Sequence, residues 1–195
     1  MKKIVIVVML IILFMPINVL AKEKVSFSSC VDGDTAKFIL NKKEITVRFL
    51  AINTPETGTN EEPYGIEASE YTCKTLKNAK KIELEYDPKS DKKDKYDRYL
   101  AWVFVDGKLL EEELIKKGLA SVAYVYDDYK YVDTLKKAEE TAKKNKKGIH
   151  SDIDKSKYKK DKSLYERVEN RVKKFFTKLK GSISDLFSDI LDEIL

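Results

Sequence analysis

The sequence predicts an α+β fold that is mainly β: a five-stranded closed barrel of the OB type with about three helices, followed by a C-terminal amphipathic helical extension. Five short segments rich in Val, Ile, Phe and Leu are spaced as strands between residues 25 and 105. Helical periodicity appears in segments between residues 64 and 146, and again after residue 153. Short strands interrupted by a few helices are typical of small closed barrels.

The first three strands form a predicted β-meander. Asp32-Gly33 favours a turn between the first and second strands, and Asn41-Lys42-Lys43 turns the second pair. The expected strands cover residues 25–31, 34–40 and 45–52, and a loop containing two prolines follows over residues 53–63.

The remainder of the domain mixes helices and strands. Ile66, Tyr71 and Leu76 lie at helical spacing, and the glycines at 118 and 148 follow apolar-periodic segments as helix ends do. The expected elements are a helix at 64–79, a strand at 81–87, a charged loop at 88–97, a strand at 98–105, a short helix at 109–117, an extended apolar segment at 119–126 and a helix at 132–146.

Residues 1–21 have the pattern of a secretory signal peptide. Lys2-Lys3 precede an unbroken apolar run from Ile4 to Met15, and Ala21 offers a cleavage site. The alternative is an uncleaved anchor, since the apolar stretch approaches the roughly 20 residues that span a bilayer. The expected organisation is a signal peptide at 1–21, one domain at 22–152 and an extension at 153–195, with the protein secreted or exposed at the cell surface.

The charge is unevenly distributed along the chain, whose formal net charge is +5. Residues 22–152 hold 25 basic and 25 acidic side chains, residues 153–180 hold 11 and 4, and residues 181–195 hold none and 4. The core domain is therefore not a generally basic surface, and any phosphate binding there has to come from local placement of charge.

The chain has two cysteines and one histidine, and these counts exclude several kinds of site. Cys30 and Cys73 would meet an oxidising compartment after export, so a disulfide and two free thiols both remain open. A single histidine, His150, excludes a typical structural zinc site and two-histidine ribonuclease chemistry. Hydrolysis by this chain would depend on carboxylates, a metal ion and arginine.

Arginine is used sparingly. The 38 basic residues include only four arginines, of which Arg48 and Arg98 lie in the core domain. Lysine supplies the ordinary positive charge, so these two arginines are expected where a planar, bidentate fork of donors matters. A buried ion pair with a structural carboxylate is the alternative for each.

The most informative stretch runs from Val31 to Glu56. It contains Asp32-Gly33-Asp34, then Arg48, then Asn53-Thr54-Pro55-Glu56. Oxygen ligands suit a hard cation such as Ca²⁺, and a guanidinium beside them suits a phosphodiester. Together they suggest metal-assisted cleavage of nucleic acid, although Asp32 is more simply interpreted as a turn residue.

These motifs resemble the staphylococcal nuclease (thermonuclease) family over about residues 25–152. The resemblance depends on their shared order and spacing: Val31-Asp32-Gly33-Asp34-Thr35, Arg48, Thr54-Pro55-Glu56-Thr57, Tyr64-Gly65, Glu67-Ala68-Ser69, Asn78-Ala79-Lys80-Lys81-Ile82, Asp94-Lys95-Tyr96 with Arg98, and Val122-Ala123-Tyr124-Val125-Tyr126. It implies an OB barrel with three helices and Ca²⁺-dependent hydrolysis of DNA and RNA that leaves 3′-phosphates. It implies no small organic cofactor.

The resemblance also implies roles for individual residues. Asp34, Asn53 and the Thr54 carbonyl would bind the metal, and Glu56 would position or deprotonate the attacking water. The phosphate would be clamped by Arg48 and Arg98, and the nucleotide would be held by Lys95, Tyr96, Tyr124 and Tyr126. Packing on one face of a strand is the alternative for the last two tyrosines.

Elementary chemistry supports these roles independently. Glu56 can act as a general base by hydrogen bonding to the attacking water. The two arginines can stabilise negative charge on the phosphate oxygens. Aromatic rings provide a stacking platform that tolerates any base.

One residue departs from the family pattern. Asn53 stands where the staphylococcal enzyme has an aspartate, so the site keeps an oxygen ligand but loses one negative charge. Because ligand charge tunes Ca²⁺ affinity, we expect an active enzyme with a raised Ca²⁺ requirement. The alternative is a non-catalytic nucleic-acid-binding module with a weakened metal site.

The extension contains two amphipathic segments separated by Gly181. The first has a lysine-rich background and the second, from Ile183, is acidic. Three hypotheses remain open: a helical hairpin or self-association, contact with a membrane surface, and electrostatic retention of nucleic acid.

Single-stranded DNA and RNA are the expected substrates of the whole chain.

Overall fold

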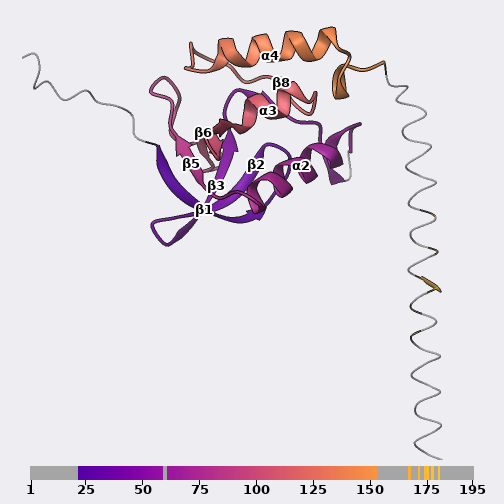
Figure 1. Ribbon diagram of the computed structural model, residues 1–195. Coiled ribbons are helices and arrows are strands. Elements are labelled where there is room, and N and C mark those ends of the chain that lie inside the picture. Colours follow the sequence, from indigo (N-terminus) through magenta and orange to yellow (C-terminus); the bar gives the residue numbers. More distant parts are fainter. Residues whose placement is uncertain are drawn as a thin grey trace, which may run out of the picture. The chain divides into compact units, whose positions relative to one another are not determined.

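The computed structural model describes residues 22–58 and 61–152, together with Arg167, Arg171, Lys174, Phe175, Thr177 and Lys180. The described residues from Lys22 to Ser151 belong to one compact unit, and the described residues from Asp152 onward belong to a second. The first unit contains a curled β-sheet with helices packed against it (Figure 1).

Five strands close into a barrel. The first three pair in sequence as antiparallel neighbours, and the fourth barrel strand joins the first to the last. The barrel closes where the last strand runs parallel to the third, with Val47 opposite Tyr99. The barrel strands are β1 (Glu23–Cys30), β2 (Thr35–Leu40), β3 (Lys43–Phe49), β5 (Ile82–Glu85) and β6 (Tyr99–Val105). The predicted five-stranded barrel is therefore confirmed.

Strand β6 lies at the centre of the packing. Residues 101–105 are all buried, so both faces of this strand are covered. The Trp102 ring, fully buried, meets the Tyr131 ring edge-on at 5.3 Å between centroids. A strand buried on both faces is expected to be continuously apolar, which explains the run Leu100–Val105.

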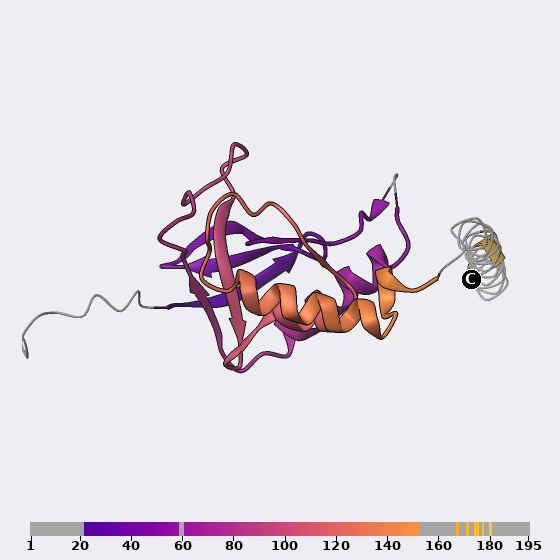
Figure 2. The ribbon, with the colours of Figure 1, turned by 90° about the horizontal axis from the view of Figure 1, so that it is seen from above.

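Three helices cover the barrel (Figures 1 and 2). Helix α2 (Gly65–Lys77) packs beside β1, while α4 (Val132–Lys144) packs on α3 (Leu110–Lys116), which in turn contacts β6. The buried positions of α2 are Gly65, Ala68, Thr72 and Leu76, a single stripe at helical spacing. The 3₁₀ helix η2 (Gly148–His150) follows α4, and the short strand β7 (Lys108–Leu109) precedes α3.

The predicted strand over residues 45–52 is interrupted. Strand β3 ends at Phe49, and Ala51 adopts a left-handed conformation with φ of 57°. The chain turns there and pairs again as β4 (Ile52–Asn53), opposite β8 (Ser121–Val122). The apolar run could not reveal this break, because the chain stays buried through it: Leu50, Ala51 and Ile52 are all buried.

The expectation that Tyr124 and Tyr126 share one face of a strand is wrong. Strand β8 ends at Val122, and Tyr124 has a positive φ of 56°. Both side chains are exposed, at 56% and 83%. They are therefore not core packing.

The two cysteines are joined. A disulfide links Cys30 at the end of β1 to Cys73 in α2, with 5.7 Å between their Cα atoms. The open question of the cysteine state is thus settled in favour of the disulfide within the structure.

The predicted extension lies almost entirely outside the described residues. The six residues described there are helical and exposed, in keeping with the first amphipathic segment, and nothing described bears on the second. The predicted signal peptide also lies outside the described residues. Within the described part of the chain, no helix is long and apolar enough to cross a membrane.

Candidate functional site

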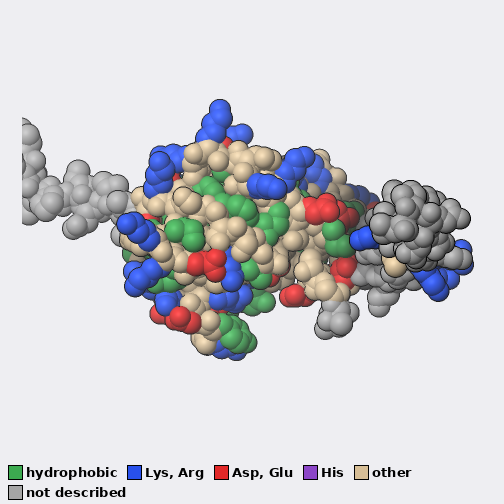
Figure 3. All heavy atoms as spheres, turned by 90° about the horizontal axis from the view of Figure 1, so that it is seen from below, with side chains coloured by type: hydrophobic (Ala, Val, Ile, Leu, Met, Phe, Trp, Pro, Cys, Tyr) green, Lys and Arg blue, Asp and Glu red, His purple; other side chains and the backbone are tan. Residues whose placement is uncertain are grey.

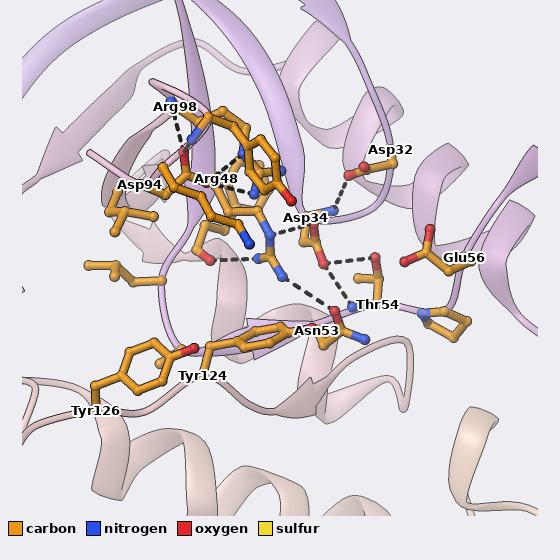
Figure 4. Close-up of a pocket in the computed structure, with 17 residues that line it drawn as sticks. Asp32, Asp34, Arg48, Asn53, Thr54, Glu56, Asp94, Arg98, Tyr124 and Tyr126 are labelled. Carbon is orange, nitrogen blue, oxygen red and sulfur yellow. Dashed lines mark hydrogen bonds and ion pairs between the residues drawn. The ribbon is translucent and has the colours of Figure 1, made fainter. Parts of the chain in front are cut away.

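All ten residues predicted for the site line one pocket of about 770 Å³ at the open side of the barrel (Figure 4). They come from five separate parts of the chain: the β1–β2 turn, β3, the segment after the Ala51 kink, the loop before β6, and the segment after β8. The pocket has an oxygen-rich end around Asp34 and an aromatic end around Tyr124 and Tyr126.

Asp34 is the buried centre of the oxygen-rich end and is 5% exposed. Its Oδ2 accepts hydrogen bonds from the Thr54 backbone N–H at 2.9 Å and the Thr54 hydroxyl at 3.1 Å. Its Oδ1 lies 3.1 Å from Nε of Arg48. These bonds join the β1–β2 turn to the loop at residue 54, so the predicted ligands Asp34 and Thr54 are brought together.

Asp32 has a larger part in the site than a turn residue alone. Its Oδ1 accepts the Asp34 backbone N–H at 3.0 Å, which is the Asx turn that the sequence suggests, but Asp32 also lines the pocket. Burial and the nearby Asp34 charge raise the pKa of Asp32 to about 6. Two carboxylates held this close favour a neutralising cation.

The kink at Ala51 places Asn53 and Thr54. The Ala123 N–H donates to the Ala51 carbonyl at 3.0 Å, and Asn53 pairs with Ser121 in the β4–β8 ladder. This small ladder holds the chain so that Thr54 lies within hydrogen-bond distance of Asp34. Asn53 Oδ1 faces the Arg48 guanidinium, with Nη2 at 3.4 Å.

Arg48 is nearly buried and most of its donors are in use. Nη1 donates to the Phe49 carbonyl at 2.8 Å and Nη2 to the Ile52 carbonyl at 2.9 Å. The guanidinium carbon lies 5.5 Å from the centre of the Tyr124 ring. The ion pair with a buried carboxylate, which was the alternative for this arginine, is present; Arg48 also lines the pocket, and its binding of phosphate stays a prediction.

Arg98 is held in the same way by a residue for which the sequence suggested no role. Asp94 Oδ2 accepts hydrogen bonds from Nε and Nη2 of Arg98, both at 2.7 Å. Burial alone would raise the pKa of Asp94, but hydrogen bonds from Arg98 and from the Tyr96 N–H outweigh it and lower the pKa. The sequence offered two signals for this pair: the spacing of Asp94 and Arg98, and their place in one motif of the resemblance. Neither assigned a role to Asp94.

Glu56 stands at the edge of the oxygen-rich end and is exposed. Its backbone is held by Glu62: the Glu62 carboxylate accepts the Glu56 N–H at 3.2 Å, and the Glu62 N–H donates to the Glu56 carbonyl at 2.9 Å. The side chain itself is open to a water molecule in the pocket, as a general base requires.

The aromatic end carries exposed rings and one lysine. Tyr96 is 68% exposed, with Lys95 Nζ 5.0 Å and the Arg98 guanidinium carbon 5.5 Å from its ring centre. Tyr124 and Tyr126 lie side by side in the same pocket, and Tyr124 faces Arg48 (Figure 4). Exposed tyrosines beside cationic side chains are the usual components of a site for single-stranded nucleic acid.

Charge is not concentrated on the face of the molecule shown in Figure 3. There, Lys and Arg side chains are spread out, with carboxylates and apolar side chains between them. This agrees with the net-neutral composition of residues 22–152. Any phosphate recognition would therefore depend on the local arrangement of charge in the pocket.

The residues at the oxygen-rich end fit a hard cation. Among the described residues, no three His, Cys, Asp or Glu side chains cluster to hold a metal by themselves. A ligand set would therefore combine the Asp34 carboxylate with neutral oxygens of Asn53 and Thr54. Carboxylate, amide and carbonyl oxygens are the donors that Ca²⁺ takes.

Comparison with known proteins agrees with this geometry. A family model described as staphylococcal nuclease homologue matches residues 46–152. The chain is 47% identical over 131 residues to Endonuclease YncB of Bacillus subtilis (strain 168), covering 65% of this chain and 61% of that protein. It is 49% identical over 131 residues to the SPbeta prophage-derived endonuclease YokF of the same organism, covering 65% of this chain and 44% of that protein.

A shorter relative is covered more completely. The Thermonuclease of Staphylococcus hyicus is 39% identical over 124 residues, which is 62% of this chain and 72% of that protein. The chain thus spans less than two thirds of the two Bacillus relatives but most of this staphylococcal one. The family match and the staphylococcal relative agree with the closed barrel and its pocket. The chain therefore belongs to the staphylococcal nuclease homologue family.

Proposed function

We propose that this protein is a secreted or surface-exposed, Ca²⁺-dependent nuclease that hydrolyses phosphodiesters of single-stranded DNA and RNA to 3′-phosphate products. The observation that carries the proposal is the convergence of Asp34, Arg48, Glu56 and Arg98, with exposed tyrosines, around one pocket. The printed names of the relatives, endonuclease and thermonuclease, support it.

Each side chain has a defined task in this proposal. Glu56 accepts a proton from the water that attacks phosphorus. Arg48 and Arg98 donate their remaining N–H groups to the phosphate oxygens as negative charge grows on them, and Lys95 and the tyrosines hold the nucleotide. Ca²⁺ bound by Asp34, Asn53 and Thr54 would supply Lewis-acid stabilisation of that charge.

The direct test is digestion of single-stranded DNA by residues 22–195, with Ca²⁺ titrated and then removed by EGTA. Glu56→Ser is the matched variant, because it removes the carboxylate and keeps a small polar side chain. We expect Ca²⁺-dependent cleavage that falls by about 100-fold or more in Glu56→Ser. Cleavage that is unaffected by EGTA, or equal in the variant, contradicts the proposal.

Asn53 supports the second candidate function, a nucleic-acid binder without catalysis. The variant Asn53→Asp separates the two. We expect it to lower the Ca²⁺ concentration for half-maximal cleavage by about tenfold, because the added negative charge strengthens the cation site. Cleavage that appears only in Asn53→Asp would show that the native protein is a binder, and an unchanged Ca²⁺ dependence would show that Asn53 is not a ligand.

A further inference from the structure

Helix α2 contacts both loops that form the oxygen-rich end of the pocket. At its first residue, a Cβ added to Gly65 would lie 2.2 Å from the Glu56 carbonyl oxygen, so helix and loop are in direct backbone contact. About two turns further on, Thr72 and Cys73 reach the β1–β2 turn that carries Asp34. No function has so far been attached to these two residues.

Thr72 holds the turn by a buried hydrogen bond. Its hydroxyl donates to the Gly33 carbonyl at 2.7 Å, and Thr72 has no exposed surface. On the other side of Gly33, an added Cβ would lie 2.7 Å from the Thr54 hydroxyl oxygen. Gly33 is therefore clamped between α2 and Thr54, and the same Thr54 donates two hydrogen bonds to Asp34.

The disulfide lies next to this clamp. Cys73 follows Thr72 directly, and Cys30 pairs with Ala36 at the base of the β1–β2 turn. Both cysteines are only half-buried, and they line an open groove of about 730 Å³ together with Phe27, Ser28, Ser29, Glu70, Lys74 and Lys77. The disulfide is thus a covalent link between α2 and the strand that leads into the Asp34 turn. It lies in a groove that a reagent in solvent can enter.

We propose that Thr72 is a positioning residue for the cation site, and that the adjacent Cys30–Cys73 disulfide locks the Asp34 turn to α2 so that reduction of this bond weakens cation binding. This inference rests on the proposed function, because it takes Asp34 as a cation ligand. Residues that orient metal ligands from behind typically change metal affinity by about 10- to 100-fold when they are removed.

The redox step needs a dithiol reductant. One thiolate of the dithiol attacks a sulfur of the Cys30–Cys73 bond, and its second thiol resolves the mixed disulfide. The protein gains two electrons and two protons as two thiols, and the dithiol leaves as its own disulfide. The reverse reaction restores the lock.

The test measures Ca²⁺ affinity by titration calorimetry on residues 22–195. The proteins are the oxidised wild type, the wild type reduced with dithiothreitol, Cys30→Ser/Cys73→Ser, Thr72→Val and Thr72→Ser. Thr141→Val is the matched control, because the Thr141 hydroxyl donates only to Lys137 within α4. Melting curves establish that each protein is folded at the temperature of the titration.

We expect Ca²⁺ affinity to fall about tenfold or more on reduction, in the double serine variant and in Thr72→Val. Thr72→Ser restores the donor and should recover affinity, while Thr141→Val should match the wild type. Dithiothreitol should not change the double serine variant.

Amide hydrogen exchange in EGTA tests the clamp without any cation. We expect faster exchange at Thr54 and in residues 31–35 after reduction and in Thr72→Val. Equal exchange or equal Ca²⁺ affinity in the locked and unlocked proteins overturns the inference. A wild type that binds no Ca²⁺ overturns the proposed function instead, and the exchange experiment still decides whether the clamp exists.

Discussion

At the scale of single residues, the two pocket arginines share one design. Arg48 is held by Asp34 and faces Tyr124, and Arg98 is held by Asp94 and faces Tyr96. An arginine side chain loses much conformational freedom when it binds a phosphate. Holding each guanidinium in place beforehand removes part of that cost from substrate binding.

Asp94→Asn tests this design at Arg98. The variant removes the ion pair, so we expect the KM for single-stranded DNA to rise severalfold at neutral pH, by about three- to tenfold. Asp97→Asn is the control, because Asp97 pairs with Lys93 rather than with Arg98. Equal KM values in the two variants would show that Asp94 does not orient Arg98.

The stability difference between the wild type and Asp94→Asn is expected to depend on pH. The folded pKa of Asp94 is lowered from its ordinary value of 3.8, so its stabilising effect is present above that value and is lost as pH falls through the lowered pKa. We expect the wild type to melt about 2 °C above Asp94→Asn at pH 7, a small difference because the pair is partly exposed. Melting curves below about pH 4 should show the difference shrinking; a difference that grows on acidification contradicts this assignment.

At the scale of elements, α2 connects the two loops that form the oxygen-rich end of the pocket. It has no residue in the pocket lining, yet it abuts Glu56 through Gly65 and Asp34 through Thr72. A helix is stiff over this length because its backbone hydrogen bonds are internal. It can therefore fix the spacing between Glu56 and Asp34, the proposed general base and the proposed cation ligand.

Gly65→Ala tests the contact at the start of α2. The new Cβ would lie 2.2 Å from the Glu56 carbonyl oxygen, so helix and loop must separate. We expect kcat/KM to fall about tenfold and the free energy of unfolding to fall by about 1–3 kcal/mol. The measurements are DNA cleavage and urea denaturation.

Gly107→Ala is the control for Gly65→Ala. Its Cβ would meet nothing within 4 Å, although its φ of +83° disfavours alanine. It should lose stability and keep its activity, whereas an active Gly65→Ala would show that the contact with Glu56 is not needed.

At the scale of the whole molecule, the barrel unit contains its own core. All the buried apolar residues of the described chain lie between Val25 and Ala142. A domain with a continuous core is expected to fold as one cooperative unit. The role of residues 153–195 stays a prediction, because nearly all of them lie outside the described residues.

Deleting residues 153–195 tests this independence. We expect residues 22–152 to melt within about 2 °C of the longer chain and to keep Ca²⁺-dependent cleavage, since every buried apolar residue of the described chain is kept. Oligomeric state, liposome binding and DNA affinity of the two proteins then separate the three hypotheses for the extension. A truncated protein that is unfolded or inactive would show that the extension is part of the working domain.

The sequence by itself determined the barrel and the helices, because hydrophobic periodicity is a local property of the chain. Asp34, Arg48, Glu56 and Arg98 could be named without coordinates because they lie in motifs that resemble the staphylococcal nuclease family, and the structure places all four around one pocket. The kink at Ala51, the Asp94–Arg98 pair, the disulfide and the Thr72–Gly33 hydrogen bond were decided only by tertiary structure. Ala51, Asp94 and Thr72 have ordinary local surroundings, and what sets their role is a backbone conformation or a partner that only the folded chain brings within reach.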